Sequence, residues 1–341
     1  MNKLIEIKRL AMFKPTPIRI DYLVNYVNDY NKKDTILNMA YFMQKEMPVR
    51  LAHRVVQLNS MPNEMANDII IKNINELYQE SLFRIKDMKI SNFSDAMKLS
   101  NVLDDIKKNH KDVAYDISIS LQYLKENMEK KPFNIDDFLN RFYNSRIGIR
   151  TLIGNYTSIC NEKNGIVDNE CNPYKIIKKC IDDCKELSMI NYAYSPNVSL
   201  IGNSEYTFPY ISAHLYYIVS ELLKNSMTAI IKNSTTDYLK DPITIMISEG
   251  EDDIIIKISD KGKGFKRSEI NNIFKYSYTT SSLSHSELKS FSMSGYGHGL
   301  PLARLYAKYF NGDLQIIPYY GFGTDAIVYI NKIGNQPEKI Y

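Results

Sequence analysis

The stretch HLYYIVSELLKNSMTAII, His214–Ile231, decides the fold of the second half of this chain. Read at helical period, it places on one side an apolar face made of Leu215, Ile218, Val219, Leu222 and Ile230. Positions i, i+3, i+4 and i+7 on the other side form a polar ridge made of Glu221, Lys224, Asn225 and Thr228. The stretch therefore predicts an amphipathic helix that buries one face and presents a row of polar groups.

Two glycine-rich motifs follow this helix in order. A strand-like segment runs into Asp260-Lys261-Gly262-Lys263-Gly264, and Gly295-Tyr296-Gly297-His298-Gly299-Leu300 opens the next helix. A Rossmann site would need a strand leading into the second motif and a βαβ unit, and no Walker Gly-Lys-Ser/Thr sequence is present. The order of helix, DxGxG and GxGxG is similar to the nucleotide site of the GHKL ATPase and kinase superfamily.

The residue types in these motifs suit a bound nucleotide. Asn225 offers one neutral oxygen to Mg²⁺, which takes one or two protein oxygens and keeps several waters. Glu221, one helical turn earlier, is placed as a general base, and Lys224 is able to meet a phosphate oxygen. Asp260 is able to accept a hydrogen bond from an adenine amino group, although Asp before Gly is also common in plain turns. Glycines let the backbone approach a ligand, and bare amides at a helix start favour anions.

Length and composition set the broad class. The chain has 341 residues, which favours about two domains, and 44% of them are hydrophobic. The net charge of +4 does not favour nucleic acid as a partner, and no apolar run reaches the ~18 residues of a membrane span. Four cysteines, of which Cys180 and Cys184 lie i, i+4 without a nearby His, indicate reduced thiols in a reducing compartment.

The first half of the chain predicts an all-α, up-and-down helix bundle, which we place at residues 1–165. The expected helices are Tyr22–Tyr30, Thr35–Glu46, a separate helix beginning at Pro48, Met65–Met88, Asp95–Asn127 and Phe133–Ile159. The polar segment 161–172, which holds a glycine, predicts the domain boundary.

The second domain, placed at residues 170–341, predicts an α+β sandwich of the GHKL ATP-binding type. The expected helices are Pro173–Ser188, the central helix and Leu300–Phe310, the last of them capped by Asn311-Gly312. The expected strands are Val198–Ile201, Glu205–Phe208, Ile243–Ile247, Ile254–Ser259, Leu314–Tyr319 and Thr324–Ile330. Residues 266–294 predict a mobile loop that begins with a short helix.

Several further segments resemble the mitochondrial pyruvate dehydrogenase kinases. They are MPVRLAHRV (Met47–Val55), NHKDV (Asn109–Val113), FLNRFYNSRIGIR (Phe138–Arg150), YAKYFNGDLQ (Tyr306–Gln315) and GFGTDAIVYI (Gly321–Ile330). The likeness runs from about Phe13 to Ile330. Branched-chain 2-oxoacid dehydrogenase kinases share the layout, but Gly-Asp-Leu-Gln fits the pyruvate branch better. The resemblance implies an ATP- and Mg²⁺-dependent protein-serine kinase that phosphorylates and shuts off the decarboxylase subunit of the complex.

The resemblance also implies roles for individual residues. Glu221 would activate the substrate serine, His110 would approach this carboxylate and tune its basicity, and Asn225 would bind Mg²⁺. The residues expected around the nucleotide are Glu221, Leu222, Leu223, Lys224, Asn225, Ser226, Met227, Thr228, Asp260, Gly262, Gly264, Thr279, Thr280, Gly295, Tyr296, Gly297, His298, Gly299, Leu300 and Thr324. Thr279 and Thr280 match lid residues, and residues 281–294 are expected to order over bound nucleotide.

The chain departs from the family pattern at Lys263, Thr228 and His298, where Gly, Arg and an aromatic residue are usual. The family's C-terminal Asp-Trp pair has no counterpart, since the sequence contains no Trp. The implied partners are the decarboxylase subunit, the lipoyl domain of the acyltransferase core and a second copy of the chain. The implied location is the mitochondrial matrix, although the basic start of the chain is short and poor in Ser.

Three other functions remain open from the sequence. The substrate is alternatively the branched-chain complex. A phosphohistidine kinase would need an acceptor on the bundle, for which His53 and His110 are the candidates. A non-catalytic nucleotide-binding scaffold is the third alternative, favoured by Lys263 and by the absent Asp-Trp pair.

Overall fold

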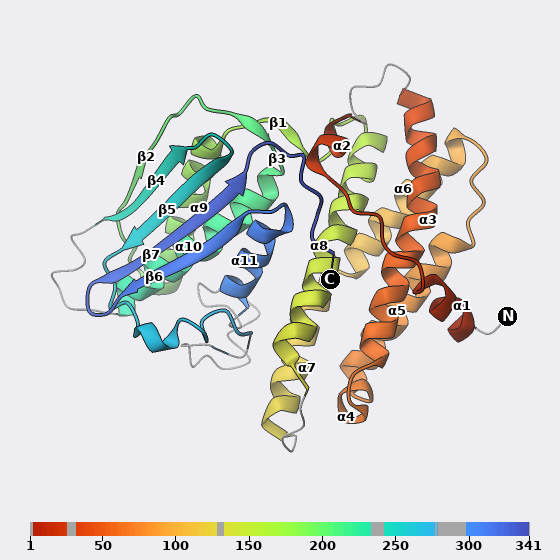
Figure 1. Cartoon of the computed structure of the whole chain (residues 1–341), viewed down its shortest axis with the longest axis horizontal. Coiled ribbons are helices and arrows are strands. Elements are labelled where there is room, and N and C mark those ends of the chain that lie inside the picture. Colours follow the sequence, from red (N-terminus) through yellow and green to blue (C-terminus); the bar gives the residue numbers. More distant parts are fainter. Residues whose placement is uncertain are drawn as a thin grey trace. The chain divides into compact units, whose positions relative to one another are not determined.

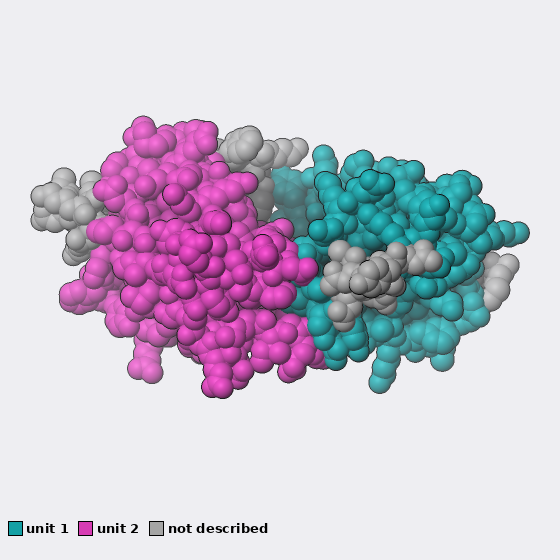
Figure 2. Space-filling view, turned by 90° about the horizontal axis from the view of Figure 1, so that it is seen from above, with its two compact units in different colours: residues 1–167, 340–341 teal, residues 168–339 magenta. Residues whose placement is uncertain are grey.

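The computed structural model describes residues 3–25, 32–127, 133–232, 242–276, 278 and 298–340 (Figure 1). The contacts within the chain divide it into two compact units, coloured separately in Figure 2. Unit 1 comprises residues 1–167 with 340–341, and unit 2 comprises residues 168–339. Each unit is therefore described by itself.

The described part of unit 1 is built from helices. They are α1 (Lys3–Leu10), α2 (Ile20–Asn25), α3 (Lys32–Asn59), α4 (Asn63–Ala66), α5 (Ile69–Lys86), α6 (Phe93–Asn109), α7 (Val113–Asn127) and α8 (Ile135–Cys160). Helix α3 packs against α1, α5, α6 and α8, and α6 also packs against α8. The core between them includes the fully buried aromatic rings of Tyr78, Phe142 and Tyr156. The predicted helical bundle is confirmed.

The predicted interruption at Pro48 is wrong, because α3 continues through this residue. A proline in a helix interior removes one backbone hydrogen bond and costs roughly 3 kcal/mol. Two contributions hold the helix together on either side of it. Met47 and Leu51 are completely buried, and the Glu46 carboxylate forms an ion pair of 2.7 Å with Nε of Arg50 across the proline.

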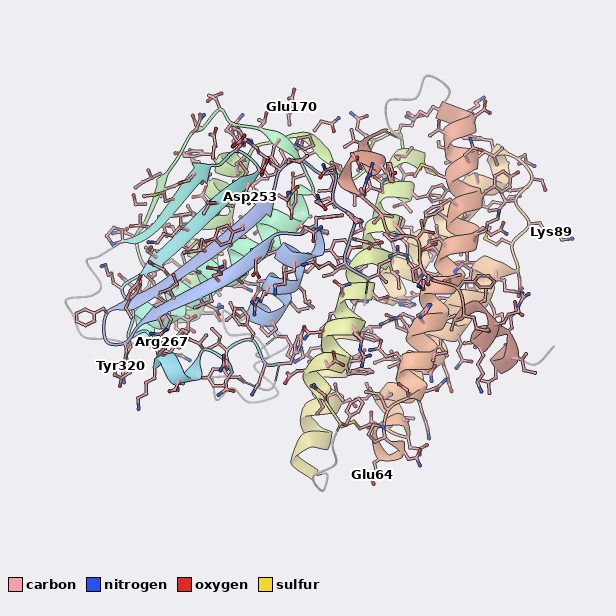
Figure 3. The ribbon with its side chains drawn as sticks, viewed as in Figure 1. Glu64, Lys89, Glu170, Asp253, Arg267 and Tyr320 are labelled. Carbon is pink, nitrogen blue, oxygen red and sulfur yellow. The ribbon has the colours of Figure 1, made fainter. Side chains whose placement is uncertain are left out.

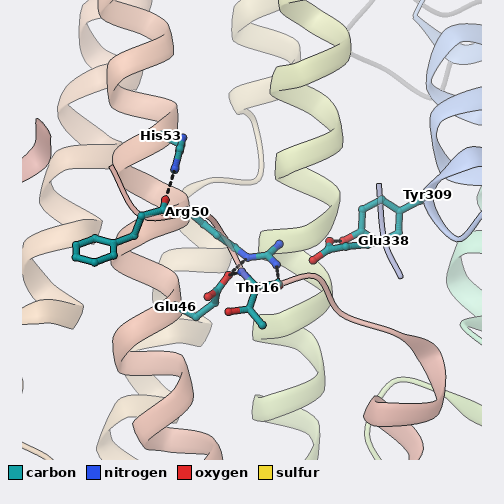
Figure 4. A network of polar contacts seen from close by, with 7 residues as sticks. Thr16, Glu46, Arg50, His53, Tyr309 and Glu338 are labelled. Atoms are coloured by element: carbon teal, nitrogen blue, oxygen red, sulfur yellow. Dashed lines mark hydrogen bonds and ion pairs between the residues drawn. The ribbon is translucent and has the colours of Figure 1, made fainter. Parts of the chain in front are cut away.

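The same ion pair fastens the segment before α2 to α3 (Figure 4). The backbone N–H of Thr16 donates to Oε1 of Glu46 at 2.9 Å, and Nη2 of Arg50 donates to the Thr16 carbonyl at 2.7 Å. One turn later, Nε2 of His53 donates to the carbonyl of Phe13 at 2.8 Å. Side chains on three successive turns of α3 therefore bond the main chain of one extended segment.

Other helix boundaries in unit 1 also differ from the predicted ones. The expected helix Met65–Met88 is divided into α4 and α5, because the Asp68 carboxylate caps the N-terminus of α5 by accepting from the N–H groups of Ile70 and Ile71. The expected helix Asp95–Asn127 is divided into α6 and α7 at residues 110–112. The predicted helix Tyr22–Tyr30 begins two residues earlier, at Ile20, and residues 26–31 lie outside the described part.

Unit 2 has a layer of helices on a mixed five-stranded sheet, and it also has a separate antiparallel sheet of two strands. Its helices are α9 (Pro173–Tyr192), α10 (Ser212–Lys232) and α11 (Gly299–Tyr309), with a short 3₁₀ helix at Arg267–Glu269. Its strands are β1 (Asp168–Cys171), β2 (Val198–Ile201), β3 (Phe208–Tyr210), β4 (Ile243–Glu249), β5 (Asp253–Asp260), β6 (Asp313–Tyr319) and β7 (Gly323–Asn331). The main sheet has the order β2-β4-β5-β7-β6, with β2 parallel to β4 and the other pairs antiparallel. Strands β1 and β3 form the two-stranded sheet.

The three long helices of unit 2 pack on the same face of this sheet (Figure 1). The alternating pattern of β5 puts Ile254, Ile256 and Ile258 beneath them, each fully buried. The predicted α+β sandwich is confirmed, and so is the hairpin of β6 and β7. Two details differ from the prediction. The strand expected at Glu205–Phe208 is β3, at Phe208–Tyr210, and the segment Asp168–Cys171, expected to be part of a polar linker, forms β1.

None of the described helices combines the length and the apolar composition that are required to cross a bilayer.

Candidate functional site

Helix α10 has the two faces that its sequence predicts. Its apolar side chains are buried to 2% exposure or less at Leu215, Ile218, Val219, Leu222, Leu223, Met227 and Ile230. Ser226 is also buried, whereas Glu221, Lys224 and Thr228 are half-buried and Asn225 is exposed. The ridge of the helix is therefore the side on which polar groups remain accessible, and Leu222, Leu223 and Met227 belong to the core beneath it.

Glu221 and Lys224 form an ion pair at the middle of this ridge. Nζ of Lys224 lies 2.5 Å from Oε1 of Glu221, and the two side chains are 19% and 15% exposed. The other carboxylate oxygen of Glu221 faces the start of α11, where a β-carbon on Gly299 would collide with it. The absence of a side chain at Gly299 thus lets the carboxylate lie against the first turn of the next helix.

Asp260 ends β5 in a buried position. Its Oδ1 accepts from the N–H of Gly262 at 2.9 Å, and its Oδ2 accepts from the hydroxyl of Ser226 at 3.1 Å. Burial, partly opposed by these hydrogen bonds, raises the pKa of the Asp260 carboxyl from 3.8 to about 6. The site therefore holds a carboxyl group that titrates near neutral pH and is fixed from both sides.

The glycines after Asp260 keep this loop against its neighbours. A β-carbon on Gly262 would lie 2.9 Å from Cβ of Ala229 on α10. Gly264 has φ of +60°, and a β-carbon there would lie 2.5 Å from the carbonyl oxygens of both Gly323 and Tyr319. The N–H of Gly321 also donates to the carbonyl of Lys263 at 2.7 Å. The loop is packed between α10 and the turn of the β6–β7 hairpin, which Tyr320 marks in Figure 3.

The hairpin brings Thr324 beside Asp260. The two residues are paired across β5 and β7, and a backbone hydrogen bond from Thr324 contributes to holding the Asp260 pKa down.

On α10, the hydroxyl oxygen of Thr228 is buried and has no hydrogen-bond partner among the described residues. A buried hydroxyl without a partner is costly, so a ligand oxygen or water is a suitable partner for it.

The second glycine motif is described only from its end. His298 precedes α11 and packs edge-on against Tyr276 at 5.0 Å, and burial lowers its pKa to about 4, so its imidazole is neutral. Gly299 and Leu300 form the first turn of α11 and are half-buried. The other predicted residues of this site, Thr279, Thr280, Gly295, Tyr296 and Gly297, and the predicted lid 281–294 lie outside the described part of the chain.

His110 lies in unit 1, so its position relative to Glu221 stays a prediction. Its ring nitrogen Nε2 is 2.8 Å from the hydroxyl of Ser81, and its ring packs edge-on against Tyr78 at 4.6 Å. Burial, together with the charges of Arg146 and Arg150, lowers the His110 pKa to about 4. The imidazole is therefore neutral and bonded within the bundle.

Two positions that support the site were absent from the predicted set. Gly323, with φ of +135°, lets the hairpin approach the carbonyl of Asp260, and Ala229 leaves room for Gly262. The two glycines of Gly321-Phe322-Gly323 are a sequence feature from which the tight approach at Gly323 could be predicted. A single alanine on a helix is too common for the role of Ala229 to be predicted.

The residues present suit a magnesium nucleotide. The exposed amide of Asn225 offers one oxygen, in keeping with a cation that keeps most of its waters and binds phosphate oxygens. Backbone N–H groups at the start of α11 favour the negative phosphates, and the buried Asp260 carboxyl favours a hydrogen-bond donor on the base.

The fold and the site define a nucleotide-binding domain of the GHKL type. A family model described as histidine kinase-, DNA gyrase B- and HSP90-like ATPase matches residues 211–333, and one described as mitochondrial branched-chain alpha-ketoacid dehydrogenase kinase matches residues 17–179. The chain is 30% identical to the mitochondrial pyruvate dehydrogenase (acetyl-transferring) kinase of Arabidopsis thaliana, with 98% of this chain and 95% of that protein covered. It belongs to the family of mitochondrial pyruvate dehydrogenase kinases.

Animal proteins show a similar relationship. The mitochondrial kinase of the same name from Drosophila melanogaster is 30% identical, over 96% of this chain and 84% of that protein. Human isozyme 1 is 29% identical, over 96% of this chain and 79% of that protein. The family likeness thus includes the helical unit as well as the nucleotide-binding unit.

Proposed function

We propose that this protein is an ATP- and Mg²⁺-dependent protein-serine kinase that phosphorylates, and so inactivates, the decarboxylase subunit of the pyruvate dehydrogenase complex. The supporting comparison is the likeness over nearly the whole chain to proteins named for this activity. The supporting geometry is the approach of the Glu221 carboxylate to the first turn of α11, within the unit that also holds Asp260.

Phosphoryl transfer depends mainly on positioning and charge, so the proposed roles are divided accordingly. Glu221 accepts the proton of the serine hydroxyl as this oxygen bonds to the terminal phosphorus, while the bond from that phosphorus to the bridging oxygen breaks and ADP leaves. Lys224, which forms an ion pair with Glu221, holds that carboxylate in place and presents a positive charge to the phosphates. The first N–H groups of α11 receive phosphate oxygens. Asn225 would hold Mg²⁺, which would neutralise charge on the triphosphate.

In the proposed adenine contact, Asp260 accepts a hydrogen bond from the exocyclic amino group. The ionised carboxylate is the stronger acceptor for this bond, and the pKa of this group is about 6 in the folded protein. We expect the affinity for ATP to be constant above this pH and to weaken by up to roughly tenfold per unit below it. Equilibrium binding of an ATP analogue between pH 5 and 8 measures this change, and Asp260→Asn is expected to bind weakly without the same step. An identical step in that variant would remove Asp260 as its cause.

The stability of the fold responds to the same group in the opposite direction. Between pH 3.8 and about 6 the folded protein binds this proton more readily than the unfolded chain does. Ionised Asp260 therefore lowers the free energy of unfolding above pH 6, and this penalty disappears as the pH falls towards 4. A weaker affinity for ATP at pH 5 is then not explained by a loss of this domain's stability through Asp260.

The branched-chain complex is the second candidate substrate, because the family model matching residues 17–179 carries that name. The decarboxylase subunits of both complexes are compared at equal concentrations with one preparation of kinase. We expect kcat/KM to be higher for the pyruvate subunit, since the similar proteins cited above carry its name. A higher value for the branched-chain subunit would reassign the substrate and leave the kinase activity in place.

A homodimer is proposed from the face of the sheet that the helices of unit 2 leave open. The described side chains on this face include the apolar residues Ile201, Met246, Ile255, Ile317, Tyr319 and Ile327. Ile201, Met246, Ile317 and Tyr319 are 39–49% exposed. An apolar face of this kind is typical of an interaction surface.

We expect the double substitution Met246→Asp with Ile317→Asp to convert the dimer to a monomer, because it places charge in the apolar face. Light scattering after size exclusion measures the mass of each form. Ile69→Asp, at a residue 67% exposed on α5, is the matched control and should leave the dimer intact. Dimerisation of the double variant at an unchanged concentration would rule out this face.

The remaining partner and the location rest on the family likeness alone. We infer that the kinase acts in the mitochondrial matrix and docks on the lipoyl domain of the acyltransferase core. Binding of the isolated lipoyl domain, measured by calorimetry, tests the second of these inferences.

A further inference from the structure

Helix α9 carries two thiols side by side in the interior of unit 2. Sγ of Cys180 lies 4.0 Å from Sγ of Cys184, one helical turn further on. The two residues are 0% and 3% exposed, and neither forms a disulfide. The proposed kinase mechanism uses neither of them.

The helix geometry excludes a disulfide between these thiols. Residues at i and i+4 on a helix have β-carbons about 5–6 Å apart, whereas a disulfide requires roughly 3.5–4.5 Å. A single atom bound to both sulfurs is compatible with the helix. Two metal–sulfur bonds of about 2.3 Å span up to about 4.6 Å, and the observed separation of 4.0 Å lies within this limit.

The surroundings of the pair are dry. Cys180 and Cys184 are 0% and 3% exposed, so an ion bound by both sulfurs would be held in the interior of unit 2. Thiolates are the form that binds metal ions.

The pair also contacts the helix that carries the candidate site. Sγ of Cys184 lies 4.0 Å from the carbonyl oxygen of Ser220, the residue before Glu221. The hydroxyl of Tyr216 on α10 donates to Oδ2 of Asp183 on α9 at 2.7 Å, which fixes the two helices at this level. An ion held by the sulfurs would therefore lie directly behind the ridge of α10.

The number of ligands selects the class of ion. Structural zinc takes four protein ligands, and no group of three or more His, Cys, Asp or Glu residues converges within the described part of the chain. Two thiolates without further protein ligands suit a soft monovalent ion that accepts low coordination, and soft sulfur ligands select copper(I).

We propose that Cys180 and Cys184 form a binding site for a thiophilic monovalent cation of the copper(I) class, located behind the Glu221 turn of α10. Binding replaces both thiol protons, which leave to solvent, and forms a bis-thiolate complex with a net charge of −1. No electron is transferred. The proposal goes beyond the kinase function and does not depend on it.

The protein is titrated without oxygen against the coloured complex of copper(I) with bicinchoninate. The absorbance of this complex falls as the protein removes copper(I) from it. We expect one equivalent to transfer to the protein, and the affinity to fall at least tenfold in Cys180→Ala and in Cys184→Ala. Cys171→Ala removes another buried free thiol of the same unit and should bind as the parent protein does. No transfer to the parent protein, or equal affinity in the double variant, would overturn the proposal.

A second measurement needs no variant and so does not depend on how the variants fold. The parent protein, with and without one equivalent of copper(I), is exposed for a short time to denaturant together with a thiol-alkylating agent. Mass spectrometry then gives the extent of alkylation of each cysteine. Slower labelling of Cys180 and Cys184, with Cys171 unchanged, is the expected result. Equal protection of all the cysteines, or of none, would contradict a specific two-thiol site.

Discussion

Replacing Glu221 by Gln is expected to lower kcat by roughly 10²–10⁴-fold, the usual contribution of a general base. The substitution keeps the size of the side chain and its place beside Gly299, but removes the group that accepts the serine proton. The affinity for ATP should change little, because the proposed contacts with base and phosphates come from other residues. Single-turnover kinetics and equilibrium binding of ATP separate the two effects.

The matched control for this experiment is Glu249→Gln. Glu249 is exposed at the end of β4, where the same loss of charge occurs away from the ridge of α10. It should leave both kcat and ATP affinity within twofold of the parent protein. A Glu221→Gln variant that keeps full activity, or that loses ATP binding together with activity, would contradict the assignment of Glu221 as the base.

Replacing Asp260 by Ala is expected to weaken ATP binding by about 10–100-fold at pH 7.5. A hydrogen bond to a charged group contributes about 1.5–3 kcal/mol, and its loss here leaves the adenine amino group buried without an acceptor. The loop should keep its course, since Gly264 and the hairpin turn still hold it from the other side. Calorimetric titration with ATP and GTP measures the loss and shows whether preference for adenine disappears with it.

Asp325→Ala provides the comparison for Asp260. Asp325 is the next residue after Thr324 on β7 and forms an ion pair of 2.8 Å with Lys257. Its loss removes a carboxylate from the same sheet without touching the candidate adenine contact. Equal weakening of ATP binding in both variants would show that charge on the sheet, and not a contact with the base, is responsible.

The parts of the fold that the sequence predicts well are those with one dominant periodic pattern. Helix α10 is the clearest case, because a single apolar stripe and a single polar ridge leave no alternative. The strand around Ile245 is equally clear, since the alternation of its residues matches burial on one face. The three successive isoleucines Ile254–Ile256 indicate a strand but not which face is buried, which the packing of the helices decides. Local pattern and tertiary packing agree at these positions.

The errors arise where tertiary contacts override a local rule. Pro48 lies inside α3 because burial and the Glu46–Arg50 ion pair offset the lost backbone bond, and neither is visible in a local window. Asp68 marks a helix start that the apolar pattern alone conceals. Tertiary structure also decides the environment of each predicted site residue, such as the ion pair of Glu221 with Lys224 and the burial of Asp260.

The decisive measurement is transfer of phosphate from labelled Mg-ATP to the pyruvate dehydrogenase decarboxylase subunit, followed by treatment with acid. We expect acid-stable label on serine that is lost in Asn225→Ala, because the variant lacks the proposed Mg²⁺ ligand. Acid-labile label on the kinase itself would indicate phosphohistidine chemistry. An unlabelled subunit, with ATP still bound by the intact protein, would contradict the kinase assignment and favour a nucleotide-binding scaffold.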